Sequence, residues 1–347
     1  MKRLLLASLL ALAITGCGKR ETDQVLQFYN WSEYMPQEVL DRFEEETGIQ
    51  VIYTTYDSNE ALYARLKLLD DSSQYDLAVP STYYVSKMGR EGLLAPIDHG
   101  KLHGLDRLDP KLRDQAFDPG NSFSIPYLWG TTGIGVNAAA VDPAGVTRWA
   151  DLWRQEFRGR VMLTNDPREV FHVGLRVLGH SANTRDRAEI EAAYHKLVEL
   201  MPSVRTFNSD APRMPYLEGE TDIGMIWNGE AATGREDLPT LTYVYPAEGA
   251  AIWMDSFVIP RNARNPEAAH RFIDFVLRPE IAAQISAAIG YATPNLEARK
   301  LLDPEVAGNR TIHPQPEDLR NAEFQEDVGD EALLIYQEYW EKLKAGH

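Results

Sequence analysis

Aromatic rings and carboxylates recur together in this sequence, at the places where short apolar runs end. The aromatic members are Trp31, Tyr34, Tyr83, Trp227 and Trp253, and the carboxylates close to them in sequence are Glu33, Asp166, Glu169 and Asp255. An aromatic face attracts an ammonium group by roughly 0.5–2 kcal/mol per contact, and a buried carboxylate pairs with the amine charge. A neutral sugar would also pack on such rings, but it gains nothing from the carboxylates. The pattern therefore favours an elongated organic cation as the ligand.

Each of these residues also has a purely structural interpretation. The run from Asp166 to Glu169, with Pro167 between them, is a capping box that would begin a helix. Trp227 and Trp253 are equally typical of core aromatics. Because a helix N-terminus disfavours cations, Tyr83 could serve one only through its ring. Taken singly, these signals leave both interpretations open.

Strand and helix patterns alternate along both halves of the chain. Strands are predicted at 25–29, 49–56, 76–80, 161–164, 222–226 and 256–259, and helices at 36–48, from 58 or 59, at 82–92, from 166, at 265–277 and at 279–289. This alternation indicates an α/β fold with a mostly parallel sheet, in which ligands bind at the carboxyl ends of strands. Because the pattern restarts in the second half, we expect two lobes that face each other across a cleft.

The N-terminus has the composition of an export signal. Lys2 and Arg3 precede an apolar run at 4–14 that is too short to span a bilayer. The segment 14–17 resembles a bacterial lipobox, which predicts a lipoprotein signal peptide at 1–16, lipidation of Cys17 and a linker at 17–24. A plain cleaved signal is the alternative, and the membrane that would hold the anchor stays open. Since Cys17 is the only cysteine, no disulfide within the chain is possible.

The chain is acidic, with a formal net charge of −17. Loss of Lys2 and Arg3 with the signal would make the mature protein still more acidic. Such a surface repels nucleic acid and anionic lipid and favours encounter with cations. It is equally typical of a soluble protein that binds no cation, so the charge agrees with the cation hypothesis without establishing it. We expect no nucleic-acid partner.

Seven segments together closely resemble the bacterial periplasmic spermidine/putrescine-binding proteins of polyamine ABC transporters. They are 30–34, 45–49, 75–84, 168–171, 224–229, 253–256 and 289–295, and the resemblance runs from about residue 26 to the C-terminus. It implies a two-lobed type II periplasmic-binding-protein fold that closes on a polyamine in the interlobe cleft. The boundaries we predict are 25–132 plus 256–301 for lobe 1 and 133–255 plus 302–347 for lobe 2.

The resemblance also implies a role for each site residue. The aromatic walls fall on Trp31, Tyr34, Tyr83, Trp227, Trp253 and Tyr291, the amine partners on Asp166, Glu169 and Asp255, an end contact on Gln325, and supporting contacts on Ser32 and Ser209. Asp166 and Glu169 would then cap a helix and bind a ligand at once, because a carboxylate has acceptor sites to spare. Three carboxylates balance a triamine, so spermidine is the expected ligand, with putrescine as the alternative.

The resemblance further implies a transport role without catalysis. The expected partners are the permease of an ABC transporter and a membrane contacted only through the lipid anchor; we expect a monomer with no cofactor and no metal. A glycoside hydrolase using Asp166 or Glu169 with Asp255 is the enzymatic alternative. The sequence contains no Gly-rich phosphate loop, zinc-type His cluster or nucleophile elbow. Other binding alternatives are a different organic cation, or ferric ion held by Tyr83 and Tyr84.

Overall fold

The computed structural model of the chain describes residues 25–68 and 74–346. The predicted signal peptide at 1–16, the linker at 17–24 and the lipidation site Cys17 lie outside the described residues. Within the two described ranges, no helix is both long and apolar enough to cross a membrane.

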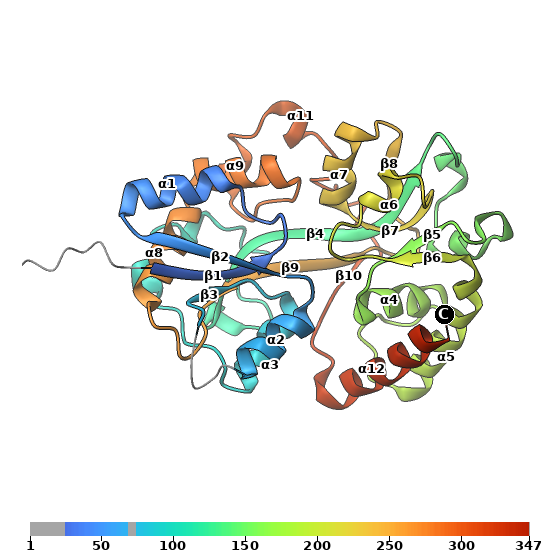
Figure 1. Ribbon diagram of the computed structural model, residues 1–347, viewed down its shortest axis with the longest axis horizontal. Coiled ribbons are helices and arrows are strands. Elements are labelled where there is room, and N and C mark those ends of the chain that lie inside the picture. Colours follow the sequence, from blue (N-terminus) through green and yellow to red (C-terminus); the bar gives the residue numbers. More distant parts are fainter. Residues whose placement is uncertain (1–24, 69–73, 347) are drawn as a thin grey trace, which may run out of the picture.

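The strands of the described residues form one mixed sheet (Figure 1). They are β1 Val25–Trp31, β2 Gln50–Tyr56, β3 Leu77–Ala78, β4 Ser124–Asn137, β5 Val161–Leu163, β6 Val204–Phe207, β7 Ile223–Trp227, β8 Leu241–Val244, β9 Ala251–Val258 and β10 Glu323–Phe324. Their order is β2-β1-β3-β9-β4-β7-β5-β6, with β10 beside β9 and β8 beside β4. The predicted parallel pairing is confirmed for β1 with β2 and β3, and for β5 with β6 and β7. It is wrong for β4 and β9, which are antiparallel to each other, and β4 is also antiparallel to β7.

The long strand β4 was missed by the sequence patterns. Its side chains are buried almost throughout, so it lacks the polar–apolar alternation of a half-exposed strand. It also contains glycines, which weaken a strand prediction. Gly130 is one that the packing requires, because a Cβ there would lie 2.4 Å from the Asn228 Oδ1 atom and 2.7 Å from the Trp253 ring.

Helices cover both faces of the sheet. They are α1 Gln37–Thr47, α2 Asn59–Leu68, α3 Thr82–Arg90, α4 Pro167–Val177, α5 Arg187–Leu200, α6 Met214–Leu217, α7 Asn228–Asp237, α8 Pro266–Val276, α9 Pro279–Ile289, α10 Leu296–Arg299, α11 Pro304–Ala307 and α12 Gly329–Ala345. The helix α1 follows its local signals closely: Val39, Leu40 and Phe43 are buried on one face, and Gly48 ends the helix with φ of 71°.

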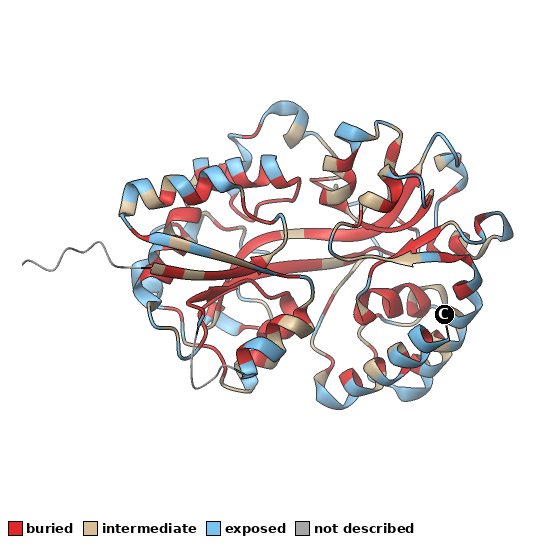
Figure 2. Ribbon diagram, viewed as in Figure 1, coloured by how far each residue is buried: buried red, intermediate tan, exposed pale blue. Residues whose placement is uncertain are grey.

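Two main hydrophobic cores lie at opposite ends of the sheet. The first joins β1 to α1 and α8 through Phe28, Phe43 and Phe272. The second joins α4 to α12 through the rings of Phe171 and Tyr336, whose centroids are 5.4 Å apart. Buried residues run along β4 and β9 through the middle of the molecule, while the outer helix faces are exposed (Figure 2).

The strands β4 and β9 join the two lobes that these cores define. In Figure 1, α1 and α9 lie over one face of the first half and α2 and α3 over the other; in the second half α6 and α7 lie opposite α4, α5 and α12. The segment containing β10 is a further connection, since it pairs with β9 and leads into α12. The predicted boundaries after 132 and 255 fall inside β4 and β9 and stay a prediction.

Candidate ligand cleft

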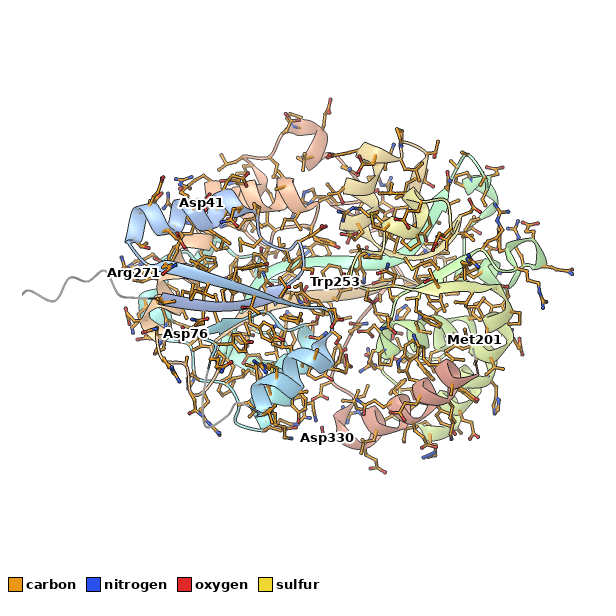
Figure 3. The ribbon with its side chains drawn as sticks, viewed as in Figure 1. Asp41, Asp76, Met201, Trp253, Arg271 and Asp330 are labelled. Carbon is orange, nitrogen blue, oxygen red and sulfur yellow. The ribbon has the colours of Figure 1, made fainter. Side chains whose placement is uncertain are left out.

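A cleft of about 680 Å³, measured with its open mouth, lies between the two lobes. Volumes of this size are typical of small-molecule sites. All but one of the residues predicted to contact a ligand line it: Trp31, Ser32, Tyr34, Asp166, Glu169, Ser209, Trp227, Trp253, Asp255, Tyr291 and Gln325. The structure therefore brings together residues from both halves of the sequence, and Trp253 lies near the centre of the molecule (Figure 3). Tyr83 is the exception and does not line the cleft.

Asp255 is a buried carboxylate at the middle of the crossing strand β9. Its Oδ1 atom accepts a hydrogen bond of 2.6 Å from the Ser81 hydroxyl, and its Oδ2 atom accepts one of 2.8 Å from the Tyr34 hydroxyl. Ser81 is held in turn by Asn59, whose amide nitrogen donates to the Ser81 Oγ atom at 3.1 Å. Burial raises the pKa of Asp255 to about 6, although the two hydroxyl donors act to lower it. The carboxylate is thus fixed in place by neutral donors and carries most of its charge at neutral pH.

Glu169 is the second buried carboxylate, on the first turn of α4. It accepts hydrogen bonds from the Thr132 hydroxyl at 2.5 Å and from the Trp227 indole nitrogen at 3.0 Å. Burial and the neighbouring charge of Asp166 raise the pKa of Glu169 to about 8. In the absence of a cation, this group therefore holds a proton at neutral pH.

Asp166 is half-buried at the N-terminus of α4. Its Oδ1 atom accepts a hydrogen bond of 2.9 Å from the Glu169 backbone nitrogen, so the predicted cap at Asp166 is confirmed. The predicted return bond from Glu169 is absent, because that side chain is directed to Thr132 and Trp227 instead. Burial raises the pKa of Asp166. Asp166 therefore caps the helix, and both carboxylates line the cleft.

The tryptophans and tyrosines of the cleft pack edge to face. The Trp253 ring centroid is 6.5 Å from that of Trp227 and 5.1 Å from that of Tyr291, and the Tyr291 centroid is 5.6 Å from that of Tyr34. Trp253 also belongs to the first core, so the structural interpretation offered for it is confirmed, and the same ring lines the cleft. At the cleft's edge, Trp31 is fixed by a hydrogen bond of 2.9 Å from its indole nitrogen to the Val79 carbonyl oxygen. The rings form rigid walls around the carboxylates.

The tyrosines at 83 and 84 are buried, and neither lines the cleft. Tyr83 is buried and places its hydroxyl 3.5 Å from the Asp166 Oδ2 atom, while Tyr84 donates to Glu60 at 3.2 Å. Burial raises the pKa of both phenols, and ferric ion binds the phenolate form. Among the described His, Cys, Asp and Glu residues, no group of three or more is placed to hold a metal ion. Nothing in the geometry of Tyr83 and Tyr84 therefore favours the iron hypothesis.

Gln325, Ser32 and Ser209 complete the predicted set. Gln325 is 4% exposed, and its side-chain nitrogen has no hydrogen-bond partner within residues 25–68 and 74–346. The backbone nitrogen of Gln325 donates to Ile252 at 2.9 Å, which fixes the residue next to β9. The Ser209 hydroxyl accepts a bond of 2.8 Å from the Asn165 backbone nitrogen and so positions the loop before Asp166. Gln325 thus offers an uncommitted amide at the cleft wall.

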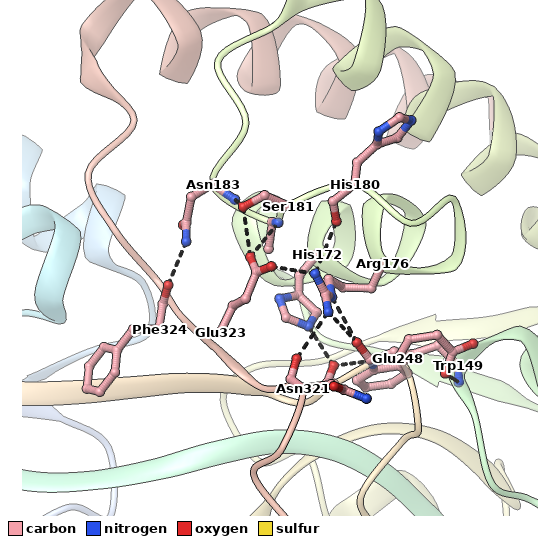
Figure 4. A network of polar contacts seen from close by, with 12 residues as sticks. Trp149, His172, Arg176, His180, Ser181, Asn183, Glu248, Asn321, Glu323 and Phe324 are labelled. Carbon is pink, nitrogen blue, oxygen red and sulfur yellow. Dashed lines mark hydrogen bonds and ion pairs between the residues drawn. The ribbon is translucent and has the colours of Figure 1, made fainter.

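A polar network behind α4 fixes that helix to the segment leading into β10 (Figure 4). The Arg176 guanidinium donates to the Glu248 carbonyl oxygen at 2.6 Å and to the Asn321 carbonyl oxygen at 3.1 Å, and it pairs with Glu323. The ring of His172 bonds to the Gly249 carbonyl oxygen at 3.0 Å. Burial lowers the pKa of His172 to about 4, so the ring is neutral and donates this bond. The network holds α4, and with it Asp166 and Glu169, against the crossing segments.

The sequence patterns missed several residues that act on the cleft. Ser81 followed a predicted strand, which was a usable signal, but its bond to Asp255 was not foreseen. Thr132 lies in the unpredicted strand β4. Glu230 also lines the cleft, and Arg213 bonds to it at 2.9 Å. No local pattern connects these two positions.

The cleft as a whole is suited to an organic cation. Among the described residues that line it there is no Lys or Arg. In the same part of the chain, no ion pair forms at Asp166, Glu169 or Asp255, although all three are removed from bulk water to different extents. Buried carboxylates normally pair with a cation or take up a proton. The geometry can therefore accept ammonium groups between aromatic walls.

Two lobes joined by β4, β9 and β10, with a lined cleft between them, define an α/β binding protein with the type II periplasmic-binding-protein fold. The chain belongs to the bacterial extracellular solute-binding protein family, whose model matches residues 38–313. It is 53% identical to the spermidine/putrescine-binding periplasmic protein of Escherichia coli K12, over 99% of this chain and 98% of that protein.

Solved structures show the same likeness. A putative spermidine/putrescine ABC transporter protein from Listeria monocytogenes is 36% identical, with a TM-score of 0.88, over 93% of this chain and 100% of that one. A lipoprotein of Treponema pallidum is 29% identical, with a TM-score of 0.82, over 92% of this chain and 99% of that one. The fold class predicted from the resemblance is confirmed.

Proposed function

We propose that this protein captures polyamines outside the cytoplasm, with spermidine preferred over putrescine, and delivers them to the permease of an ABC transporter. The observation that carries the proposal is the set of carboxylates without cationic partners, Asp166, Glu169 and Asp255, between the tryptophans of the cleft. Three negative charges balance a triamine and exceed a diamine. The names of the relatives described above support the same ligand class.

Binding begins with the acidic surface, which attracts the polycation to the open cleft. Methylene groups pack on the indole and phenol rings, while each ammonium meets a carboxylate and releases any proton that the carboxylate holds. The lobes then close about β4 and β9 and present a surface to the permease. No bond of the ligand breaks in this cycle, so the proposed function is transport without catalysis. We propose separately that the protein acts as a monomer.

Calorimetric titration of the protein, unfolded to remove bound ligand and then refolded, tests the ligand class. We expect saturable binding at about micromolar affinity or tighter, near 8 kcal/mol, with spermidine ahead of putrescine. Putrescine ahead would retain the polyamine class and reject the charge-matching argument. No heat from either amine would overturn the proposal, and release of sugar from a polysaccharide panel would revive the hydrolase alternative.

We also propose that the protein is held on a bacterial membrane by a lipid on Cys17. The lipobox-like segment 14–17 supports this, as does the fact that a structural relative from Treponema pallidum is a lipoprotein. Metabolic labelling with a radioactive fatty acid in an expressing bacterium should label the protein and leave the Cys17→Ser variant unlabelled. Equal labelling of both proteins would reject the anchor, and no labelling of either would favour a plain cleaved signal.

A further inference from the structure

An ion-pair triad lies at the edge of the cleft. The Arg213 guanidinium donates to both carboxylate oxygens of Glu230, at 2.9 and 3.0 Å, and through its other nitrogen to Glu33 at 2.7 Å. Glu33 and Glu230 both line the cleft. The side chain of Glu230 is 15% exposed and that of Arg213 is 21% exposed, so this pair is largely shielded from water. Glu33 is 64% exposed and lies on the opposite lobe, in the turn after β1.

The charge of this triad differs from that of the other cleft carboxylates. The buried or half-buried members Asp166, Glu169 and Asp255 have no cationic partner among the described residues, whereas Glu230 forms two charge-assisted bonds to Arg213. Asp57 and Asp210 also line the cleft, but both are exposed to solvent. Burial raises the pKa of Glu230, and the guanidinium acts against that shift. The electrostatic field of Glu230 reaches the cleft, because among the neighbouring charges Glu230 has the largest effect on the phenol of Tyr291, which lines the cleft.

We propose that Arg213 determines how many amines the cleft accepts, by neutralising a fourth carboxylate, Glu230, that would otherwise face the ligand. This inference rests on the proposed polyamine function. With Arg213 in place, three buried or half-buried carboxylates remain for ammonium groups, and a fourth ammonium would meet a carboxylate whose charge Arg213 already pairs. Without it, Glu230 would offer a fourth anionic site in a shielded position, which favours a tetraamine.

The same arginine also bridges the two lobes through Glu33. Loss of that bridge weakens the closed state for every ligand to the same extent, so it changes all affinities together. When the affinities of one variant for two ligands are divided, this common effect of the lost Glu33 bridge cancels. The ratio of the spermine to the spermidine association constant therefore reports the cleft charge alone.

Calorimetry of the full chain with spermidine and spermine provides the test. In Arg213→Gln, the ratio should shift toward spermine by about tenfold, the effect of one charge-assisted hydrogen bond. The matched control is Arg213→Gln with Glu230→Gln, in which the triad regains the net charge of the wild type and the ratio should return to the wild-type value. A ratio unchanged in Arg213→Gln, or one still shifted in the double variant, would overturn the proposal.

Glu230→Gln alone keeps the inference testable if Arg213→Gln does not fold. That variant leaves Arg213 paired with Glu33 alone and so removes the net negative charge of the triad, and the ratio should move the other way, against spermine. Movement toward spermine, or none, would reject the inference. Failure of the wild-type protein to bind either amine would instead reject the proposed function, so the two failures are distinguishable.

Discussion

The two carboxylate groups of the cleft are built in different ways. Asp255, on β9, receives two hydroxyl bonds from Ser81 and Tyr34, and its pKa is about 6. On α4, Asp166 and Glu169 lie within each other's electrostatic field, and the pKa of Glu169 is about 8. The first group carries its charge before a ligand arrives. The second acquires its full charge only when an ammonium group compensates it, so the cleft combines a fixed anchor with a group whose charge depends on the ligand.

Neutralising each group in turn is the most severe test of this comparison. Asp255→Asn should weaken spermidine binding by about 100-fold, near 3 kcal/mol, because a buried ammonium loses an ionised partner. Glu169→Gln should cost only about tenfold at pH 7, because part of its pairing energy is used to release the proton. Calorimetry at one salt concentration measures both effects.

The control for both variants is Asp274→Asn, a carboxylate on α8 that bonds to His103 and does not line the cleft. It should leave the affinity unchanged. An unchanged affinity in Asp255→Asn would remove that residue from the site. A larger loss in Glu169→Gln than in Asp255→Asn would reverse the comparison.

Local sequence signals predicted the helices and strands that are determined by residues close together in the sequence. The helix α1 has an amphipathic face bounded by Pro36 and Gly48, and both ends were predicted to within a residue or two. The strand β4 was not predicted, because its burial on both faces follows from the helices that cover it and from no pattern of its own. Antiparallel pairing of β4 with β9 was missed for the same reason.

The residues of the cleft show the same distinction between local and long-range causes. Residue types at strand ends predicted which side chains would gather, because the carboxyl ends of parallel strands meet at one edge. Their partners could not be predicted, since Ser81 and Asp255 are 174 residues apart and Glu33 and Arg213 are 180 apart. Tyr83 shows the limit most clearly: its position after a strand was right, but it is buried with its hydroxyl at Asp166 and does not line the cleft.

The raised carboxyl pKa values also predict opposite pH dependences for stability and for binding. Glu169 has an ordinary pKa of 4.5 when unfolded and about 8 when folded, and Asp255 goes from 3.8 to about 6. Between these values the folded protein binds more protons than the unfolded chain, so the free energy of unfolding without ligand falls as pH rises from about 4 to 8. The affinity for spermidine rises over the upper part of this range, by up to about 50-fold between pH 6 and 8, because the ionised fraction of Glu169 rises from about 1% to about 50%.

Thermal unfolding across this pH range, with and without spermidine, measures both dependences at once. The melting temperature without ligand should fall with pH while the increase caused by the ligand grows. Glu169→Gln should flatten the ligand-induced curve above about pH 6, where Glu169 is the cleft carboxylate with the highest pKa. The curve without ligand should lose part of its slope, because burial also raises the pKa of Glu60 to about 7. A ligand-induced increase that does not change with pH would contradict the distinction between the two carboxylate groups.

The smallest expected effect concerns contacts that hold the two lobes together outside the cleft. Lys87 on α3 bonds to Asp330 on α12 at 2.6 Å, and Arg90 pairs with Asp327 beside it; Figure 3 labels Asp330 on the outer surface. Asp330 is 61% exposed, so its pair is worth at most about 1 kcal/mol and is screened by salt. Asp330→Asn should therefore weaken spermidine binding by no more than about fivefold at low salt.

The kinetics of this variant decide between two origins of the effect. Because the pair joins the two lobes, its loss should increase the dissociation rate and leave the association rate nearly unchanged. Stopped-flow tryptophan fluorescence follows both rates, since Trp227 and Trp253 line the cleft. If the association rate fell instead, Asp330 would act through long-range attraction of the polycation. The closed state would then depend on the ligand's own contacts with the Asp255 and α4 groups, and the exposed pair would add nothing to closure.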